Sequence, residues 1–266
     1  MYYTRDLILA YWLATRCKPL YYEIHTLPDT PSTIYRSVWK KVSGIITISA
    51  GLKKQLVAWG VDEKKIQVAN DAVDIKQFQL IESKQSCREK LNLPLTATII
   101  VYTGHLYEWK GASLLAEAAS LVPPEMQIYL VGGTAKDSAH FKAIYQAANL
   151  RIIGWQPHEL IPYWDKAADV LVLPTSGKEK IGALYTSPLK LFEYLVTDAA
   201  IVAARLPSVQ ASVNTNEVIF FEPDNVVDLA RAIREAVLNP PTRTNLTQAH
   251  TWEERAEIII NFIRKT

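Results

Sequence analysis

Along most of the chain, short apolar runs alternate with segments whose apolar residues recur at helical spacing. The runs predict strands at residues 20–25, 44–48, 65–69, 97–103, 126–131, 150–153, 170–174, 200–203 and 218–221. The segments between and after them predict helices at residues 33–42, 50–59, 112–121, 139–148, 159–168, 189–196, 226–238 and 252–264. Nearly continuous apolar strands separated by helices are typical of parallel sheets covered on both faces. The pattern predicts a doubly wound α/β fold, in which ligands bind at the carboxyl ends of the strands.

A polar stretch at residues 76–86, followed by a helix-like SCREKLNL and Pro94, indicates a linker between two domains. We therefore expect a first Rossmann-like domain at residues 1–78 and a second at residues 79–250. A Pro-Pro turn precedes the last helix, at residues 251–266. That helix is expected to pack back on the first domain.

The composition is that of an ordinary globular protein, with 49% hydrophobic and 21% charged residues in 266. Cys17 and Cys87 are far apart and show no CxxC or Cys/His spacing, which argues against a disulfide framework and a zinc site and fits a reducing cytoplasm. The apolar opening MYYTRDLILAYWLATRCKPL is interrupted by charged residues. It is too short and too charged to span a membrane.

The net charge of +2 is unevenly distributed. Through residue 56 the chain has eight Lys and Arg against three Asp and Glu, giving +5, and the remainder has 21 against 24, giving −3. Tyr and Trp residues are interleaved with the basic part, which favours an anionic membrane surface or a phosphate-bearing acceptor. Solvated helix faces explain the same residues. Nucleic acid is not expected as a partner, because no recognition motif accompanies a nearly neutral chain.

The stretch SPLKLFEYLVTDAAIVAA, residues 187–204, combines a candidate phosphate site with a carboxylate. Ser187 is expected to cap the helix and Pro188 to occupy its first position, so that the free amides of the first turn face an anion. Lys190 adds positive charge there, and Glu193 is placed to accept hydrogen bonds from vicinal hydroxyls such as those of a ribose. The same apolar spacing also fits an ordinary core helix.

A second candidate site is VYTGHLYEWKG, residues 101–111, directly after a predicted strand. Gly104 allows a tight turn close to a ligand, His105 offers a donor, and Lys110 can reach a phosphate. The alternative is a surface loop that carries a lysine. In a parallel sheet both stretches would lie at the same carboxyl edge, so the two signals support each other.

Five motifs follow one another along the chain: GIITISAGLKKQL, KIQVANDAVDIKQF, YTGHLYEWKG, SPLKLFEYL and AAIVAARLPS. Similar motifs occur in the same order in the family 4 (group 1) glycosyltransferases of the GT-B fold, and the chain resembles that family. The resemblance implies transfer of a sugar from a UDP- or GDP-linked donor, with retention of anomeric configuration, to a glycan or lipid-linked acceptor. It implies no metal and no other cofactor, and the sequence has no DxD motif. Residues 79–250 would then be the nucleotide-sugar-binding domain.

Carried over residue by residue, the resemblance assigns Lys110 to the leaving diphosphate, whose charge it would neutralise as the glycosidic bond breaks. It assigns His25, in YEIHT, to the donor sugar, although a hydrogen-bonded histidine at a strand end fits the pattern equally well. The expected donor-binding residues are Gly104, His105, Tyr185, Thr186, Ser187, Leu189, Lys190 and Glu193. The remaining histidines without motif partners, expected at the surface or in packing, are His140, His158 and His250.

The chain departs from the family pattern in three ways. Tyr185 stands where the family has the first acid of its Glu-x7-Glu motif, and His105 stands where an arginine often follows the loop glycine. By the same resemblance, the chain is expected to begin inside the family's first domain. Three functions therefore stay open: an enzyme, a catalytically silent nucleotide-sugar-binding half that needs a complementing chain or a dimer (or a truncated gene product), and a sugar-nucleotide epimerase. The expected location is cytoplasmic, with peripheral contact at the inner face of the membrane.

Overall fold

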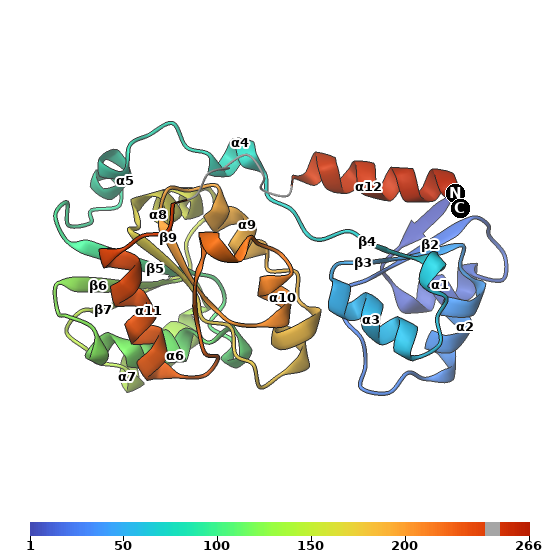
Figure 1. Cartoon of the computed structure of the whole chain (residues 1–266), viewed down its shortest axis with the longest axis horizontal. Coiled ribbons are helices and arrows are strands. Elements are labelled where there is room, and N and C mark those ends of the chain that lie inside the picture. Colours follow the sequence, from blue (N-terminus) through green and yellow to red (C-terminus); the bar gives the residue numbers. More distant parts are fainter. Residues whose placement is uncertain (243–250) are drawn as a thin grey trace. The chain divides into compact units, whose positions relative to one another are not determined.

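The protein is represented by a computed structural model that describes residues 1–242 and 251–266 (Figure 1). The chain divides into two compact units. Unit 1 contains Met1–Ala72, the short segment Leu184–Ser187 and the C-terminal helix α12 (Trp252–Lys265). Unit 2 begins at Val73 and contains the rest of the described chain. The chain thus passes from one unit to the other before the predicted linker at residues 76–86.

Unit 1 is built on a parallel sheet in the order β1-β2-β3-β4. Its strands are β1 (Tyr2–Thr4), β2 (Leu20–Ile24), β3 (Gly44–Thr47) and β4 (Ile66–Val68). The connections contain the helices α1 (Leu7–Leu13), α2 (Thr33–Lys41) and α3 (Ala50–Ala58) and the 3-10 turn η1 (Glu63–Lys65). Helix α12 packs on this unit, because Ile259 and Phe262 form a buried cluster with Tyr21, Ile46 and Ala69.

Unit 2 is built on a parallel sheet in the order β10-β9-β8-β5-β6-β7. Its strands are β5 (Thr98–Thr103), β6 (Met126–Val131), β7 (Leu150–Gly154), β8 (Val170–Leu173), β9 (Ala200–Ala204) and β10 (Ile219–Phe221). Its α-helices are α4 (Ile75–Phe78), α5 (Lys84–Lys90), α6 (Ala112–Ala118), α7 (Ala135–Ile144), α8 (Ile161–Ala167), α9 (Leu189–Leu195), α10 (Pro207–Gln210) and α11 (Val226–Leu238). Shorter 3-10 turns are η2 (Glu108–Lys110), η3 (Ala119–Leu121), η4 (His158–Leu160) and η6 (Thr215–Glu217). A π-helical turn, η5 (Ile181–Tyr185), begins in unit 2 and ends with two residues that belong to unit 1.

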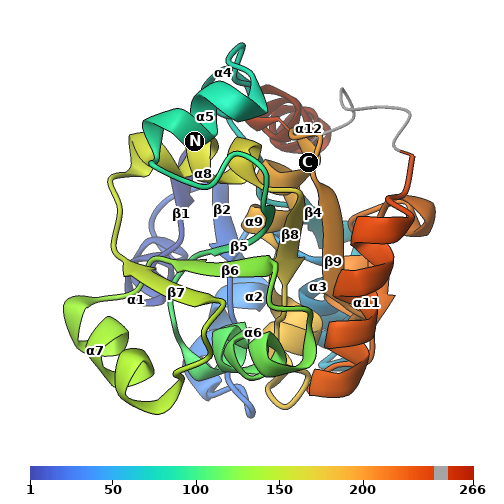
Figure 2. The same cartoon turned by 90° about the vertical axis from the view of Figure 1, so that its left-hand side faces the viewer.

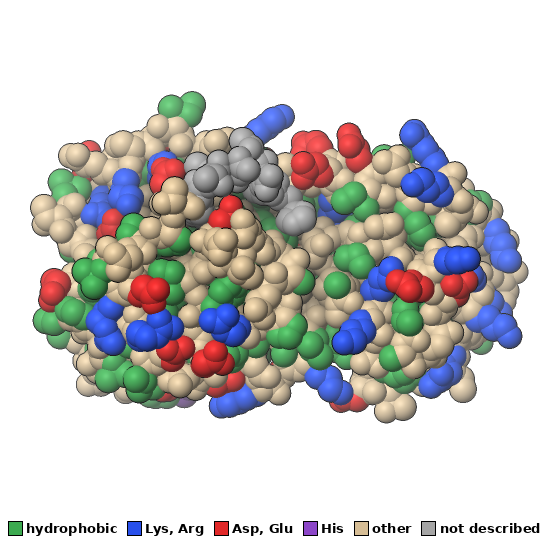
Figure 3. Space-filling view, viewed as in Figure 1, with side chains coloured by type: hydrophobic (Ala, Val, Ile, Leu, Met, Phe, Trp, Pro, Cys, Tyr) green, Lys and Arg blue, Asp and Glu red, His purple; other side chains and the backbone are tan. Residues whose placement is uncertain are grey.

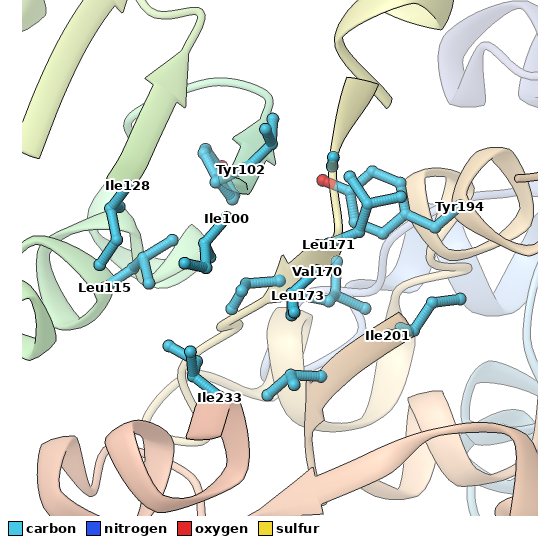
Figure 4. Close-up of a cluster of buried hydrophobic side chains, with 14 of the residues drawn as sticks. Ile100, Tyr102, Leu115, Ile128, Val170, Leu171, Leu173, Tyr194, Ile201 and Ile233 are labelled. Carbon is cyan, nitrogen blue, oxygen red and sulfur yellow. The ribbon is translucent and has the colours of Figure 1, made fainter. Parts of the chain in front are cut away.

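Helices cover both faces of the unit 2 sheet, with α6, α7 and α11 on one side and α5, α8 and α9 on the other (Figure 1 and Figure 2). Because both faces are covered, the strands β5, β6 and β8 are buried along almost their whole length. Figure 4 shows the resulting core, in which Ile100 lies close to Leu115 of α6 on one face of the sheet, whereas Leu171 lies beside Tyr194 of α9 on the other. Full burial of each such side chain contributes about 1.5–3 kcal/mol.

The predicted fold class is confirmed, since every predicted strand is present and both sheets are parallel. The helix predicted at residues 139–148 was placed four residues too late, because Thr134 and Asp137 form a capping box that starts α7 at Ala135. Strand β1 and helix α1 were not predicted. Asp6 caps α1 by accepting from the Leu9 amide, so a charge that interrupts the apolar run in fact starts a helix.

Candidate functional site

The centre of the unit 2 sheet contains a topological switch point. Strands β5 and β8 are neighbours, and from them the chain continues outward in opposite directions, through β6 and β7 on one side and through β9 and β10 on the other. Loops that leave the carboxyl ends of two such strands diverge and open a crevice, which is where doubly wound sheets bind ligands. Lys110 follows β5 and the helix α9 follows β8, so both candidate stretches of the sequence emerge at this point.

The loop after β5 is fixed in place by its backbone. Gly111 has a φ of 73°, and a Cβ at this position would lie only 1.9 Å from the carbonyl oxygen of Pro174, just after β8. The Ser176 amide donates to the carbonyl oxygen of Trp109 at 2.9 Å. Only glycine combines this left-handed conformation with so close an approach. The loop that carries Lys110 is therefore locked to the segment that follows β8.

Two lysines and one carboxylate gather at the switch point. Glu193 of α9 is only 2% exposed, and its Oε2 lies 2.5 Å from Nζ of Lys190. Burial, and to a smaller extent the charge of Lys190, lower the pKa of Lys110 to about 8, while Glu193 acts in the opposite direction. The Lys110 ammonium also lies 4.1 Å from the ring centroid of Trp109. With both lysines charged, the cluster carries one positive charge more than it can neutralise, which favours an anionic ligand.

A neutral acid lies in the same cluster of charges. Asp165 of α8 is fully buried, and its Oδ1 accepts from the Thr103 hydroxyl at 3.1 Å. Burial raises the pKa of Asp165 to about 8, although the charge of Lys190 lowers it in part. The Thr103 amide donates to the Tyr194 hydroxyl at 3.0 Å, which links β5 to α9. A protonated Asp165 leaves the positive charge of the two lysines undiminished.

The second group of candidate residues lies in unit 1, at the carboxyl end of β2. His25 directly follows this strand and is 35% exposed. Its Nε2 lies 2.5 Å from Oε1 of the buried Glu23, which also pairs with Arg255 of α12 at 2.7 Å. These residues line a hollow of about 420 Å³ together with Asp71. Burial raises the pKa of the Asp71 carboxyl.

The model of the family described as "Glycosyl transferases group 1" matches residues 97–239, which is more than half of the chain. The chain belongs to the group 1 glycosyl transferases. This membership agrees with the resemblance seen in the motifs of the sequence, and the matched residues include Lys110 and Glu193 at the switch point.

This group 1 glycosyl transferase is 26% identical over 219 residues to the putative colanic acid biosynthesis glycosyl transferase WcaI of Escherichia coli K12, a match that covers 79% of this chain and 53% of WcaI. The chain thus spans about half the length of that relative. Among solved structures it resembles Anabaena Alr3699/HepE in complex with UDP, with a TM-score of 0.82 and 18% identity over 99% of this chain and 78% of HepE. It also resembles sucrose-phosphate synthase from Thermosynechococcus elongatus, with a TM-score of 0.79 and 20% identity over 99% of this chain and 72% of the synthase. These likenesses establish the GT-B fold class.

The predicted cap of helix α9 is wrong. Helix α9 begins at Leu189 with Pro188 as its N-cap residue, and no side chain within residues 1–242 or 251–266 caps it. Ser187 instead accepts a hydrogen bond from the Asp71 amide at 2.8 Å. The hydroxyl is therefore occupied by the backbone of unit 1, which is why Ser187 does not cap α9. The sequence placed Pro188 one residue too far into the helix.

The segment Leu184–Ser187 belongs to unit 1. Tyr185 is buried in the apolar core of that unit, and its carbonyl oxygen accepts from the Ser49 hydroxyl at 2.9 Å. Tyr185, at the position of the family's first acid, therefore fills a core, whereas Thr186 is half-buried. Leu189, the first residue of α9, is exposed.

The remaining predicted residues are Gly104 and the other histidines. Gly104 directly follows the strand β5 and has a φ of 155°, and the exposed His105 next to it stacks on Tyr107 with ring centroids 4.8 Å apart. His158 contacts the Gln77 side chain at 2.7 Å. The ring of His140 lies edge-on to Phe141, and His250 lies outside the described residues.

Sequence reasoning missed three side chains that shape these sites: Asp165, Glu23 and Arg255. A carboxylate within a buried apolar stretch was the available signal for Asp165 and for Glu23, because such a residue needs partners or a shifted pKa. For Arg255 no local pattern gave a signal.

Proposed function

We propose that this group 1 glycosyl transferase moves a sugar from a nucleotide diphosphate donor, UDP- or GDP-linked, to a glycan or lipid-linked acceptor with retention of anomeric configuration. The observation that carries the proposal is the charge cluster of Lys110, Lys190 and Glu193 at the switch point of the unit 2 sheet. A diphosphate is the anion that fits two lysines, and a buried carboxylate beside them suits ribose hydroxyls. The complexes of HepE with UDP and with UDP-glucose, in a protein of the same fold, support a donor of this class.

In this proposal Lys110 stabilises the leaving nucleoside diphosphate. Negative charge builds on the phosphate oxygen as the glycosidic bond breaks, and an ammonium group in a site of low dielectric lowers the energy of that state. Lys190 adds a second positive charge, and Glu193 accepts hydrogen bonds from the ribose. Because the two lysines supply the charge, the proposal includes no metal ion and predicts that a chelator leaves the activity unchanged.

For the acceptor we propose a lipid-linked glycan presented at the cytoplasmic face of the membrane. Helix α1 exposes the large apolar side chains Ile8, Leu9, Tyr11 and Trp12, and the guanidinium of Arg16 lies 4.5 Å from the ring centroid of Trp12. Figure 3 shows further Lys and Arg side chains on another part of the surface of unit 1. Apolar and aromatic side chains among cations are the composition of a surface that lies on anionic lipid. No helix in residues 1–242 or 251–266 has the length and apolar character needed to cross a membrane.

The test is binding and transfer by the purified chain. Titration calorimetry measures the affinity of the donor site for UDP and GDP, and radiolabelled UDP- and GDP-sugars measure transfer of the sugar. Lys110→Ala is expected to weaken binding by about 1–3 kcal/mol, the cost of a lost charge-assisted contact. Lys142→Ala is the matched control, because Lys142 lies exposed on α7 of the same unit.

The outcomes separate the alternatives. Equal affinity of Lys110→Ala and the unsubstituted chain would remove the donor-site assignment. Nucleotide binding without transfer would favour the catalytically silent half, and transfer that appears only after a second chain is added would identify the need for a complementing partner.

A further inference from the structure

The carboxylate of Glu23 is buried in the sheet of unit 1. The residue is 5% exposed, and it lies on β2, of which every residue is buried. An ionised carboxylate in such a place is costly unless hydrogen bonds and charges compensate it. Among the residues that the structure describes, Glu23 has three partners: Oε1 is 2.5 Å from Nε2 of His25 and 2.7 Å from Nη2 of Arg255, and Oε2 accepts from the Tyr3 hydroxyl.

These partners keep Glu23 ionised. Burial by itself would raise the pKa of this carboxyl, but the hydrogen bonds from His25 and Tyr3 and the positive charge of Arg255 outweigh burial and lower the pKa of Glu23 to about 2. An ionised carboxylate has only acceptor atoms. The short contact between Oε1 and Nε2 of His25 therefore requires that Nε2 carries the proton. In the neutral ring, Nδ1 is then a hydrogen-bond acceptor.

Residues on other secondary-structure elements hold the Glu23 carboxylate in the position that makes this contact. Arg255 is mostly buried, and its Nε donates to the carbonyl oxygen of Asn70 at 2.9 Å while its Nη2 holds Glu23. Tyr3 on β1 holds the other carboxylate oxygen. Glu23 thus has little freedom to rotate. The ring of His25, in contrast, is one-third exposed and lines the hollow that also contains Arg5 and Asp71.

We propose that Glu23, held by Arg255 and Tyr3, is a positioning residue that fixes His25 in the Nε2–H tautomer and leaves Nδ1 as an acceptor for a substrate hydroxyl. The inference rests on the proposed transferase function and extends it to what His25 recognises. A bare Nδ1 accepts a hydrogen bond from a sugar hydroxyl, whereas a deprotonated phosphate oxygen has no proton to give it. His25 accordingly orients a hydroxyl and does not bind the diphosphate.

The tautomer is measured directly by long-range ¹⁵N–¹H NMR of the histidine ring, at a pH where the imidazole is neutral and without any donor present. The expected spectrum has a pyrrole-like Nε2 and a pyridine-like Nδ1. Glu23→Gln should populate both tautomers, because an amide can accept from or donate to Nε2. Asp71→Asn, which removes a carboxylate from the same hollow, should leave the tautomer unchanged. A mixed or Nδ1–H ring in the unsubstituted protein, or an unchanged ring in Glu23→Gln, would overturn the proposal.

Kinetics give the second readout. Glu23→Gln is expected to lower kcat by about tenfold or more, with a smaller change in the donor KM, because carboxylates that hold an imidazole in one tautomer contribute at least this much elsewhere. Glu257→Gln is the control, since Glu257 lies exposed on the same helix as Arg255. A parallel rise in donor KM with unchanged kcat would contradict a positioning role.

A pair of His25 variants keeps the proposal testable if Glu23→Gln does not fold. The side-chain oxygen of His25→Asn can stand at the place of Nδ1, whereas the amide of His25→Gln reaches the place of Nε2. The asparagine variant should retain several-fold more activity than the glutamine variant, and the reverse order would refute the assignment. If the unsubstituted chain transfers no sugar at all, the proposed function fails, while the NMR result still decides the tautomer.

Discussion

Binding of a nucleoside diphosphate should weaken as the pH rises through 8. The pKa of Lys110 is lowered to about 8, so about nine-tenths of the molecules carry this charge at pH 7 and about one-tenth at pH 9. If only the ammonium form binds, the Kd for UDP rises about tenfold across this interval, in proportion to the lost competent fraction. The sign is fixed by linkage: an anion raises the pKa of a neighbouring lysine, so affinity is present below pH 8 and is lost above it.

Asp165 adds to this dependence. Its pKa is raised to about 8, so it gains a negative charge in the interval in which Lys110 loses a positive one. The charge of UDP stays nearly constant over this interval, because the second ionisation of a phosphate lies near pH 6. The decline should therefore be steeper than Lys110 alone would give. The arginine of Lys110→Arg stays charged throughout, so this substitution should remove most of the loss of UDP affinity between pH 7 and pH 9. Asp165→Asn should remove the rest of that loss.

The assay is titration calorimetry with UDP at pH 7, 8, 9 and 10 at constant ionic strength, on the unsubstituted chain, the two single variants and the double variant. The reasoning is refuted if the unsubstituted chain binds UDP equally well at pH 7 and pH 9. It is also refuted if Lys110→Arg shows the same decline as the unsubstituted chain, since the titrating group would then lie elsewhere.

Three further outcomes follow from single side chains. Glu193→Gln should weaken UDP binding by about 1–3 kcal/mol in calorimetry, while the exposed Glu125→Gln should not. Gly111→Ala should lower the melting temperature, because a left-handed φ costs about 1–3 kcal/mol and the new Cβ collides with the Pro174 carbonyl. In urea titrations the free energy of unfolding should fall from about pH 4 to about pH 8, where folded Asp165 retains a proton that the unfolded chain has released; Asp165→Asn should flatten this slope.

The sequence predicted the parts of this fold that depend on local pattern. Strands buried on both faces leave apolar runs, and for that reason β5 and β8 were found with nearly correct bounds. The positions of Lys110 and Glu193 after predicted strands then placed both residues at the same carboxyl edge of the sheet, and the observed strand order adds that this edge is a switch point. The start of α7 was within reach too, because Thr134 and Asp137 stand at capping-box spacing.

What the sequence could not show are partners far apart along the chain. Ser187 has the pattern of a helix cap, yet the amide that occupies it belongs to Asp71, 116 residues away. Glu23 is held by Arg255, 232 residues away. Hydrogen bonds of this kind depend on how the elements fold back on one another, and local preference is overridden when a tertiary partner satisfies the same atom.

The two units use opposite electrostatic arrangements, and under the proposed function each arrangement suits a different part of the donor. In unit 2, Glu193 neutralises only one of the two lysines, and burial keeps Asp165 protonated, so that a net positive charge remains for an anion. In unit 1, Arg255 neutralises the charge of the ionised Glu23, and the carboxylate also forms a hydrogen bond with the imidazole of His25. When its ring is neutral, His25 presents an uncharged acceptor, Nδ1, in the hollow that it lines. Salt should therefore weaken binding of the nucleotide diphosphate strongly, whereas selection among sugar hydroxyls by His25 should be insensitive to ionic strength. If donor sugars that differ in one hydroxyl are discriminated by a ratio of kcat/KM that changes with salt, this division of labour is incorrect.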